Sequence, residues 1–129
     1  GFSKSENEAF EKYLSRGRST FTSRRQLELK ELVQIIRNAG GVVGLAHPKF
    51  GHARELLPKL VKLGLAAIEV YHPTHSIEDI RTFQRLARRY KLIEVGGSDF
   101  ETERSPVGAV TVPYSAVEQL KKKHKRRVR

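Results

Sequence analysis

The sequence predicts an α/β fold in which parallel strands alternate with helices. Three observations support this prediction. Short apolar runs recur from residue 42 onward, helical periodicity fills the intervals between them, and the first three runs end in AHP, EVYHP and GGSDFE. In folds of this class, ligand sites lie at the carboxyl ends of the strands, where these polar residues are expected.

The composition of the 129-residue chain fits one globular domain, with 38% apolar and 30% charged residues. No apolar run approaches the roughly 20 residues that cross a bilayer, so no membrane partner is expected. The absence of Cys excludes disulfides, thiolate metal sites and Cys nucleophiles, and makes a cytoplasmic setting the expectation. Any metal would be held by His, Asp or Glu, which favours Mn, Zn, Fe or Mg.

Residues 1–25 are predicted to form a helix and a loop. Ser5 and Glu8 have the spacing of a capping box, and apolar residues follow at helical intervals as far as Ser15. The polar, basic segment RSTFTSRRQ then lacks any periodicity, which indicates a loop. The α/β domain is therefore expected over residues 26–120.

Within this domain a first helix carries an apolar face from Leu29 to Ile36 and ends at Gly40 and Gly41. A later helix is capped by Ser76 and Asp79. The apolar runs predict strands at residues 42–46, 66–70, 92–95 and 110–112. The helical patterns between and after them predict helices at 53–63, at 77–90 and from about residue 115.

The net charge of +11 lies mostly in the last nine residues, KKKHKRRVR, which hold seven Lys or Arg and no acid. Residues 121–129 are thus a basic tail. Such a tail binds polyanions by releasing their counterions, and it is equally typical of a solvated helix end.

The strand ends offer metal ligands. His47 follows the first strand, and the Pro that comes next favours an extended backbone there. Glu69 lies inside an apolar run, where an unpaired carboxylate is costly, so it needs a cation, a hydrogen-bond network or solvent. His72 and His75 follow in a turn, where the alternative is a solvated loop.

Asp99 and Glu101 follow the third strand and point to one face if the segment is extended. Paired acids bind hard cations, and Gly96 and Gly97 allow the backbone to approach a ligand closely. The alternative for Asp99 is a turn or a helix cap in a surface loop.

The stretches NAGGVVGLAHP, LGLAAIEVYHPTH and GGSDF together resemble the PHP family of polymerase and histidinol phosphatase domains. The similarity extends over about Ala9–Pro113 and is greatest to the branch of nucleoside 3′,5′-bisphosphate phosphatases and the exoribonuclease RNase AM. It implies part of a distorted (β/α)7 barrel with up to three divalent metal ions at the strand ends.

The resemblance also implies roles for residues of this chain. His47 and Asp99 match metal ligands of the family, and Glu101 occupies the place of a further metal-binding His. The residues that match a lining or substrate-binding role are Glu69, His72, His75, Arg16 and Arg18, with Lys12 beside the last two.

The opening HxHxxxSDG motif of the family has no counterpart here, so the chain corresponds to the second half of such a domain. A site with two or three ions needs more ligands than His47, Asp99 and Glu101 provide. Divalent ions are therefore expected to be bound incompletely by this chain alone, and the missing N-terminal half or a second copy is the expected partner.

Two functions follow from these observations. The leading hypothesis is part of a metal-dependent phosphoesterase that hydrolyses phosphate esters of nucleotides or short RNA. The alternative is a non-catalytic PHP remnant, in which the half-barrel is a scaffold that self-associates or binds nucleic acid through its basic tail.

Overall fold

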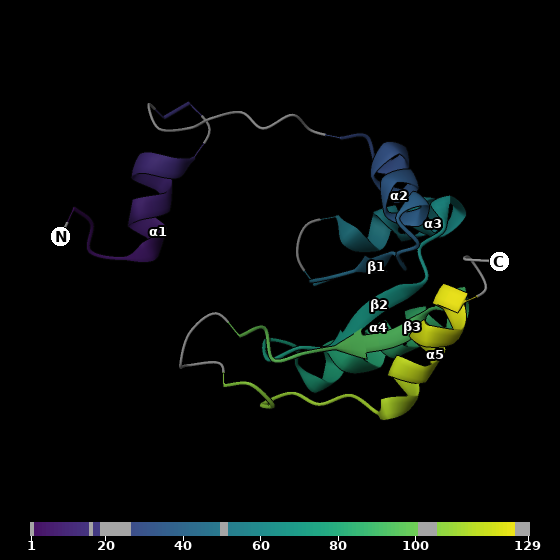
Figure 1. Ribbon diagram of the computed structural model, residues 1–129. Helices are drawn as coiled ribbons and strands as arrows, with labels where there is room; N and C mark the ends of the chain where they lie inside the picture. The colour runs from purple at the N-terminus through teal and green to yellow at the C-terminus, as the bar shows by residue number, and fades with distance from the viewer. Residues whose placement is uncertain (1, 16, 19–26, 50–51, 101–105, 126–129) are drawn as a thin grey trace.

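A computed structural model describes residues 2–15, 17–18, 27–49, 52–100 and 106–125. Three parallel strands form one sheet in the order β1–β2–β3, with helices between them (Figure 1), which confirms the predicted α/β class. The elements are α1 (Glu6–Ala9), the π-helix η1 (Phe10–Leu14), α2 (Leu29–Asn38), β1 (Gly44–Leu45), α3 (Ala53–Leu63), β2 (Ala67–Tyr71), α4 (Ile77–Tyr90), β3 (Ile93–Gly96) and α5 (Tyr114–Lys125).

The N-terminal helix begins where the capping signal predicts. The Ser5 side chain accepts a hydrogen bond from the Glu8 amide at 3.1 Å, and the Glu8 carboxylate accepts one from the Lys4 amide at 2.7 Å. Figure 1 shows α1 set apart from the sheet. Phe10, the first residue of η1, is exposed, so this N-terminal segment adds little to the core.

The core lies on one face of the sheet. Ile68 and Val70 of β2 are fully buried there. They pack against side chains of α2, α3 and α4, namely Val33, Leu57, Leu60, Phe83 and Ala87. Because consecutive strands lie side by side and their connecting helices share one face, the arrangement is that of a barrel segment.

The opposite face of the sheet is covered in part by α5. Ala67 of β2 and Ile93 of β3 are buried against Ala116 of α5, with Leu120 packed beside them. The alternation of Ala67 with Ile68 along β2 therefore places apolar side chains on both faces, as expected of a parallel strand.

Helix α4 shows how local signals position the strand ends. Ser76 caps it in a complete capping box with Asp79, as predicted, and Lys91 ends it in a left-handed conformation with φ of 53°. Helix α3 ends at Gly64, whose φ of 113° suits a residue without a β-carbon.

Two strand predictions need correction. The first strand is Gly44–Leu45, shorter than the predicted residues 42–46. The predicted strand at 110–112 does not form, because the Val110 amide donates to the Ser98 side chain at 3.1 Å and the Gly108 amide donates to the same oxygen at 2.9 Å. A side chain thus takes the place of a neighbouring strand.

Helix α5 runs to Lys125, beyond the predicted start of the basic tail at residue 121. The ring nitrogen Nδ1 of His124 lies 2.7 Å from the carbonyl oxygen of Gly40, which joins the end of α5 to the turn before β1. No helix in the described part of the chain is long and apolar enough to cross a membrane.

Candidate metal centre

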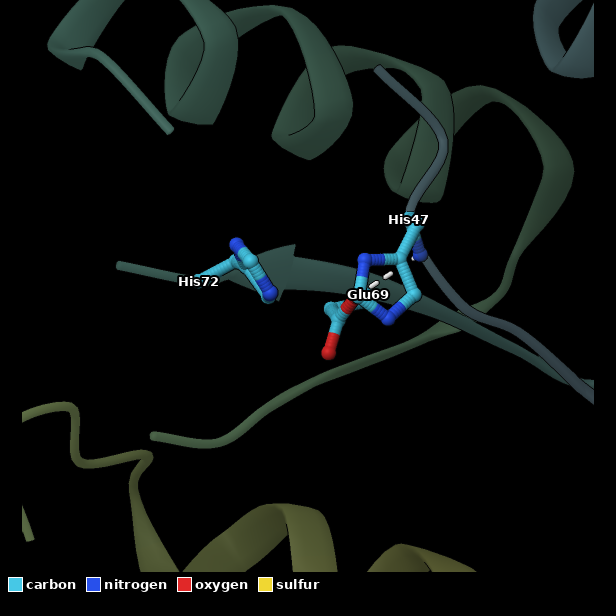
Figure 2. A group of neighbouring side chains, drawn as sticks. All are labelled: His47, Glu69 and His72. Atoms are coloured by element: carbon cyan, nitrogen blue, oxygen red, sulfur yellow. Dashed lines mark hydrogen bonds between the residues drawn. The ribbon is translucent and has the colours of Figure 1, made fainter. Parts of the chain in front are cut away.

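Three side chains with metal-binding atoms meet at the carboxyl ends of β1 and β2. His47 follows β1, Glu69 lies in β2, and His72 comes directly after it. One ligand atom from each lies within 4.8 Å of the others (Figure 2). Parallel strands end at the same edge of the sheet, which explains how His47 meets two residues that stand 22 or more positions further along the chain.

Asp99, which follows β3, joins them. Its carboxylate oxygen Oδ2 lies 3.1 Å from Nε2 of His72, and Oδ1 lies 3.9 Å from Nε2 of His47. We call His47, Glu69, His72 and Asp99 the strand-end cluster. Two imidazoles and two carboxylates are donors that suit first-row divalent ions such as Zn, Mn or Fe.

The backbone at two cluster residues differs from the sequence-based expectation. His47 and Asp99 have φ of 48° and 47°, in the left-handed region, whereas His47 was expected to be extended and the shared face of Asp99 and Glu101 depended on an extended backbone. The third described non-glycine residue in this region is Lys91, the ordinary end of a helix. Left-handed backbone at bulky residues is strained and concentrates at functional sites.

Glu69 acts on the backbone of the cluster. Its oxygen Oε2 accepts a hydrogen bond from the His47 amide at 2.7 Å, marked by the dashed line in Figure 2. The carboxylate, half-buried within an apolar strand, thereby gains the hydrogen-bond partner that its burial requires. Glu69 thus helps to hold the turn that carries His47.

His72 is buried, with 5% of its surface exposed, and its neighbours define its tautomer. The Thr74 amide donates to Nδ1 at 3.2 Å, so Nδ1 is the acceptor and Nε2 carries the proton. Nε2–H then donates to Asp99 at 3.1 Å. The hydroxyl oxygen of Thr74 also lies 2.9 Å from Nδ1.

His75 lies beside His72 and is not part of the strand-end cluster. Its Nδ1–H donates to the Val70 carbonyl at 2.8 Å, and its ring packs on Phe83 and on the ring of His72. Among the described residues, its buried Nε2 has no hydrogen-bond partner. The predicted contact of His75 with substrate stays a prediction.

Among the remaining predicted residues, Arg18 lies away from the cluster. Arg18 donates from Nε to the Glu11 carbonyl at 2.9 Å, beside η1. Arg16 and Glu101 lie outside the described residues. The roles predicted for these three residues stay predictions.

Gly96 allows the close packing of β3 against β2, whereas the sequence suggested that its backbone approaches a ligand. A β-carbon on Gly96 would overlap the carbonyl oxygen of Tyr71, where the pairing of β2 and β3 is irregular. A β-carbon on Gly97 would meet open space. A cavity of about 210 Å³ adjoins this point on the sheet, and Glu69 and Gly96 are among its lining residues.

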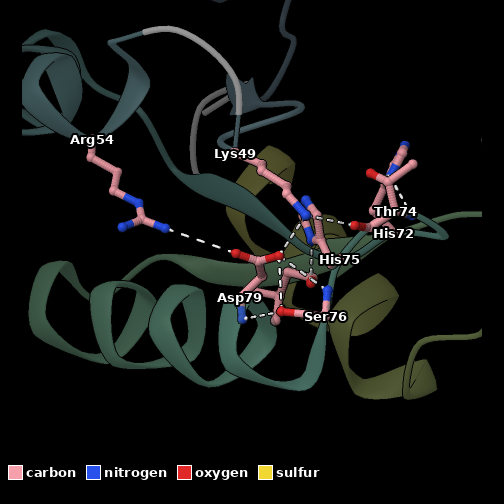
Figure 3. A network of polar contacts seen from close by, with 8 residues as sticks. Lys49, Arg54, His72, Thr74, His75, Ser76 and Asp79 are labelled. Atoms are coloured by element: carbon pink, nitrogen blue, oxygen red, sulfur yellow. Dashed lines mark hydrogen bonds and ion pairs between the residues drawn. The ribbon is translucent and has the colours of Figure 1, made fainter.

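Sequence reasoning missed Lys49 and Thr74, and it gave Asp79 only the role of a helix cap. Lys49 Nζ lies 2.8 Å from Oδ2 of Asp79 and donates to the Thr74 carbonyl at 2.9 Å (Figure 3). The only sequence signal is position, since Lys49 follows the His-Pro pair and Thr74 stands between two histidines. The Lys49 ammonium and then the Ser76 amide lower the pKa of Asp79 to about 2.

No family model matches the chain. Two curated proteins are similar to it. A phosphoribosyl 1,2-cyclic phosphate 1,2-diphosphodiesterase of Eggerthella lenta is 39% identical over 74 residues, which are 57% of this chain and 28% of that protein. A 3′,5′-nucleoside bisphosphate phosphatase of Chromobacterium violaceum is 34% identical over 96 residues, 70% of this chain and 34% of that protein.

Two solved structures share the fold. An amidohydrolase from Chromobacterium violaceum, solved with sulfate and no metal, matches with a TM-score of 0.73 and 28% identity. A putative metal-dependent phosphoesterase from Bifidobacterium adolescentis matches with a TM-score of 0.76 and 23% identity. Each comparison covers 95% of this chain and 46% of the other, so the chain spans about half of these structures and about a third of the curated relatives.

Proposed function

Because the chain is a relative of the PHP-type metal-dependent phosphoesterases, we propose that it forms part of a metal-dependent phosphoric-ester hydrolase. The observation that carries this proposal is the strand-end cluster, in which His47, His72 and Asp99 converge at the edge where this class of fold binds ligands. Their donor atoms fit a divalent ion, which would polarise a phosphoryl oxygen and activate water when bound.

Each cluster residue has a distinct part in this proposal. His47 and Asp99 hold the ion, and His72 supports it from a buried position beside Asp99. Glu69 orients His47 through its backbone amide. Glu101 is proposed as a further ligand, in the place where the family has a metal-binding His. The proposed ion is Mn, Zn, Fe or Mg.

The proposed substrate class is a phosphate ester of a nucleotide or short RNA. Both curated relatives are named for phosphate esters of ribose or nucleosides. The net charge of +11 favours a polyanionic ligand. Arg16, Arg18 and His75 are proposed to meet the substrate, and the cytoplasm is the proposed setting.

The chain supplies only part of the proposed centre. Its relatives are about three times as long as the matched segment, and the cluster offers fewer ligands than a site for two or three ions needs. We infer that the partner is the preceding half of a PHP domain or a second copy of the chain, and that it contributes the other ligands.

The second candidate function is a non-catalytic scaffold that binds nucleic acid. One observation favours it: Lys121, Lys122 and Lys123 are exposed on α5, while Ala116 and Leu120 fix this helix to the sheet. A basic helix held on a rigid domain is a suitable electrostatic surface for a phosphate backbone.

Phosphate release distinguishes the two functions. The chain is mixed with the part of the Chromobacterium violaceum phosphatase that precedes the matched segment, and adenosine 3′,5′-bisphosphate is added with Mn²⁺ or with a chelator. Metal-dependent release that Asp99→Asn abolishes supports the hydrolase. Absence of release from an assembled complex that binds metal supports the scaffold.

A further inference from the structure

The turn after β1 is tied to the start of α4 by one side chain. Lys49 stands two residues after His47, and its ammonium reaches the Asp79 carboxylate at 2.8 Å and the Thr74 carbonyl at 2.9 Å (Figure 3). Asp79 is held in turn by the capping box of α4, where it accepts from the Ser76 amide at 3.1 Å. The anchor is therefore part of a rigid helix end.

This tie acts on both histidines of the cluster. In the turn after β1, the contacts of Lys49 hold the end of the segment that begins at His47, and Pro48 between these two residues is fully buried. On the other side, the Thr74 carbonyl belongs to the residue whose amide and hydroxyl set the orientation of His72. One ammonium thus links the two loops whose rings lie 4.8 Å apart.

The left-handed backbone of His47 is a conformation that such a tie helps to hold. His47 has φ of 48°, which is uncommon for a residue other than glycine and is further restricted by the proline that follows it. The Glu69 carboxylate holds the His47 amide on the upstream side. Lys49 adds a hold on the downstream side of the same turn.

We propose that Lys49, anchored by Asp79 and the Thr74 carbonyl, is a positioning residue that keeps the His47 ring facing His72 and its partner Asp99, so that His47 and Asp99 can hold a divalent ion. The binding of an ion rests on the function proposed above. The arrangement of the two rings, in which they face one another, does not depend on that function. Residues that orient metal ligands typically change affinity by about 10- to 100-fold when removed.

Arg54 provides a matched control. Its guanidinium lies 4.0 Å from the same Asp79 carboxylate, whereas only Lys49 also donates to the Thr74 carbonyl among the described residues. Lys49→Ala and Arg54→Ala each remove one positive charge near the cluster. By electrostatics alone, both would bind a cation more tightly, so weaker binding by Lys49→Ala isolates the positioning effect.

The test has two readouts on the 129-residue chain. Calorimetric titration with Mn²⁺ and Zn²⁺ should give an affinity about 10- to 100-fold weaker for Lys49→Ala, unchanged or tighter for Arg54→Ala, and largely restored for Lys49→Arg. In the metal-free chain, the nuclear Overhauser effect between the His47 and His72 rings should disappear in Lys49→Ala and persist in Arg54→Ala.

The readouts separate the two levels of the proposal. If the wild-type chain binds neither ion, the cluster does not hold an ion without the partner that supplies the other ligands, and the ring contact alone decides the role of Lys49. If Lys49→Ala keeps the ring contact and the wild-type or tighter affinity, Lys49 is not a positioning residue. Circular dichroism shows whether each variant is folded. If Lys49→Ala does not fold, the affinity and the ring contact of Lys49→Arg still test the role of Lys49.

Discussion

His47 and Asp99 share an unusual backbone as well as a suitable chemistry. Each adopts a left-handed conformation that costs a residue with a β-carbon free energy, about 1–3 kcal/mol in sparsely populated regions. Such conformations persist only where contacts over-determine them. At His47 these contacts come from Glu69 and, through the turn, from Lys49.

Metal binding should depend on the residues of the strand-end cluster and not on histidines elsewhere on the surface. Asp99→Asn keeps a residue that tolerates the left-handed backbone but removes the charge, and it should abolish Mn²⁺ or Zn²⁺ binding. The wild-type chain should bind no tighter than roughly micromolar, about −8 kcal/mol, because its ligand set is incomplete. Titration calorimetry measures both.

The control for this experiment is His52→Gln. His52 is exposed and lies 3.1 Å from Glu55, outside the strand-end cluster. Equal loss of binding in His52→Gln and Asp99→Asn would show that the ion binds to surface groups.

Acid stability should report on Asp79. Its pKa in the folded chain is about 2, below the ordinary value near 4, so the ionised carboxylate stabilises the fold fully above about pH 4. That contribution is lost as the pH falls from about 4 towards 2. Asp79→Asn should remove this part of the pH dependence, as measured by urea unfolding between pH 2 and 5.

Glu78→Gln is the matched variant, since Glu78 is the exposed acid one position earlier in the same helix turn. It should keep the wild-type acid profile. Identical profiles for Asp79→Asn and the wild type would mean that the pairing with Lys49 does not stabilise the fold.

Among the elements, β3 depends on a glycine at its end. Gly96 lies against the backbone of β2 at the irregular pairing beside Tyr71, and the Gly97 amide donates to the Tyr71 carbonyl at 3.0 Å. The close approach brings Asp99, three residues further on, towards His72. The glycine thus acts on the cluster through the strand.

Gly96→Ala should destabilise the chain by about 1–3 kcal/mol, because its β-carbon would overlap the Tyr71 carbonyl and force the strands apart. Gly97→Ala should cost far less, since a β-carbon there meets open space. Chemical unfolding of both variants measures the difference. Similar stabilities for the two would refute the close-packing explanation.

Helix α5 carries the element-scale prediction on nucleic acid. Deletion of residues 121–129 removes seven cationic groups, so it should weaken RNA binding sharply and flatten its salt dependence. Fluorescence anisotropy at several salt concentrations measures both effects. Replacement of the exposed Lys59 and Lys62 on α3 by Ala is the control. If it weakens RNA binding as much as the deletion does, residues 121–129 are not a specific binding site.

The elements that the sequence predicts well are those with strong local signals. Helix α4 has a capping box and an apolar face, and its observed bounds match the prediction. The strand expected at 110–112 fails because hydrogen bonding by Ser98, twelve residues away from Val110, has no local signal. For the same reason the role of Lys49 could not be predicted from the sequence, since it depends on a partner 30 positions away.

For the whole molecule, the notable surface lies beside β1. Within the described residues this strand pairs only with β2, and its other side adjoins an apolar groove of about 390 Å³. Leu32 and Leu56, which line the groove, are 41% and 40% exposed. An unpaired strand edge beside exposed leucines is a surface for association.

Assembly should therefore depend on this groove. Leu32→Glu should abolish association with the preceding half of a PHP domain or with a second copy, because it places a charge on the apolar face. Ile77→Glu, at a residue 65% exposed at the start of α4, should not. Sedimentation velocity measures the assembled fraction, and equal assembly by both variants would place the interface elsewhere.

The length of β1 sets how such a partner would be recognised. A strand of two residues offers few backbone hydrogen bonds to an incoming strand. The backbone alone is then a poor guide to register, and the match of apolar side chains on α2 and α3 decides which partner fits. Halves from different relatives should therefore be interchangeable when these helix surfaces are complementary, and incompatible when they are not, however similar their strands.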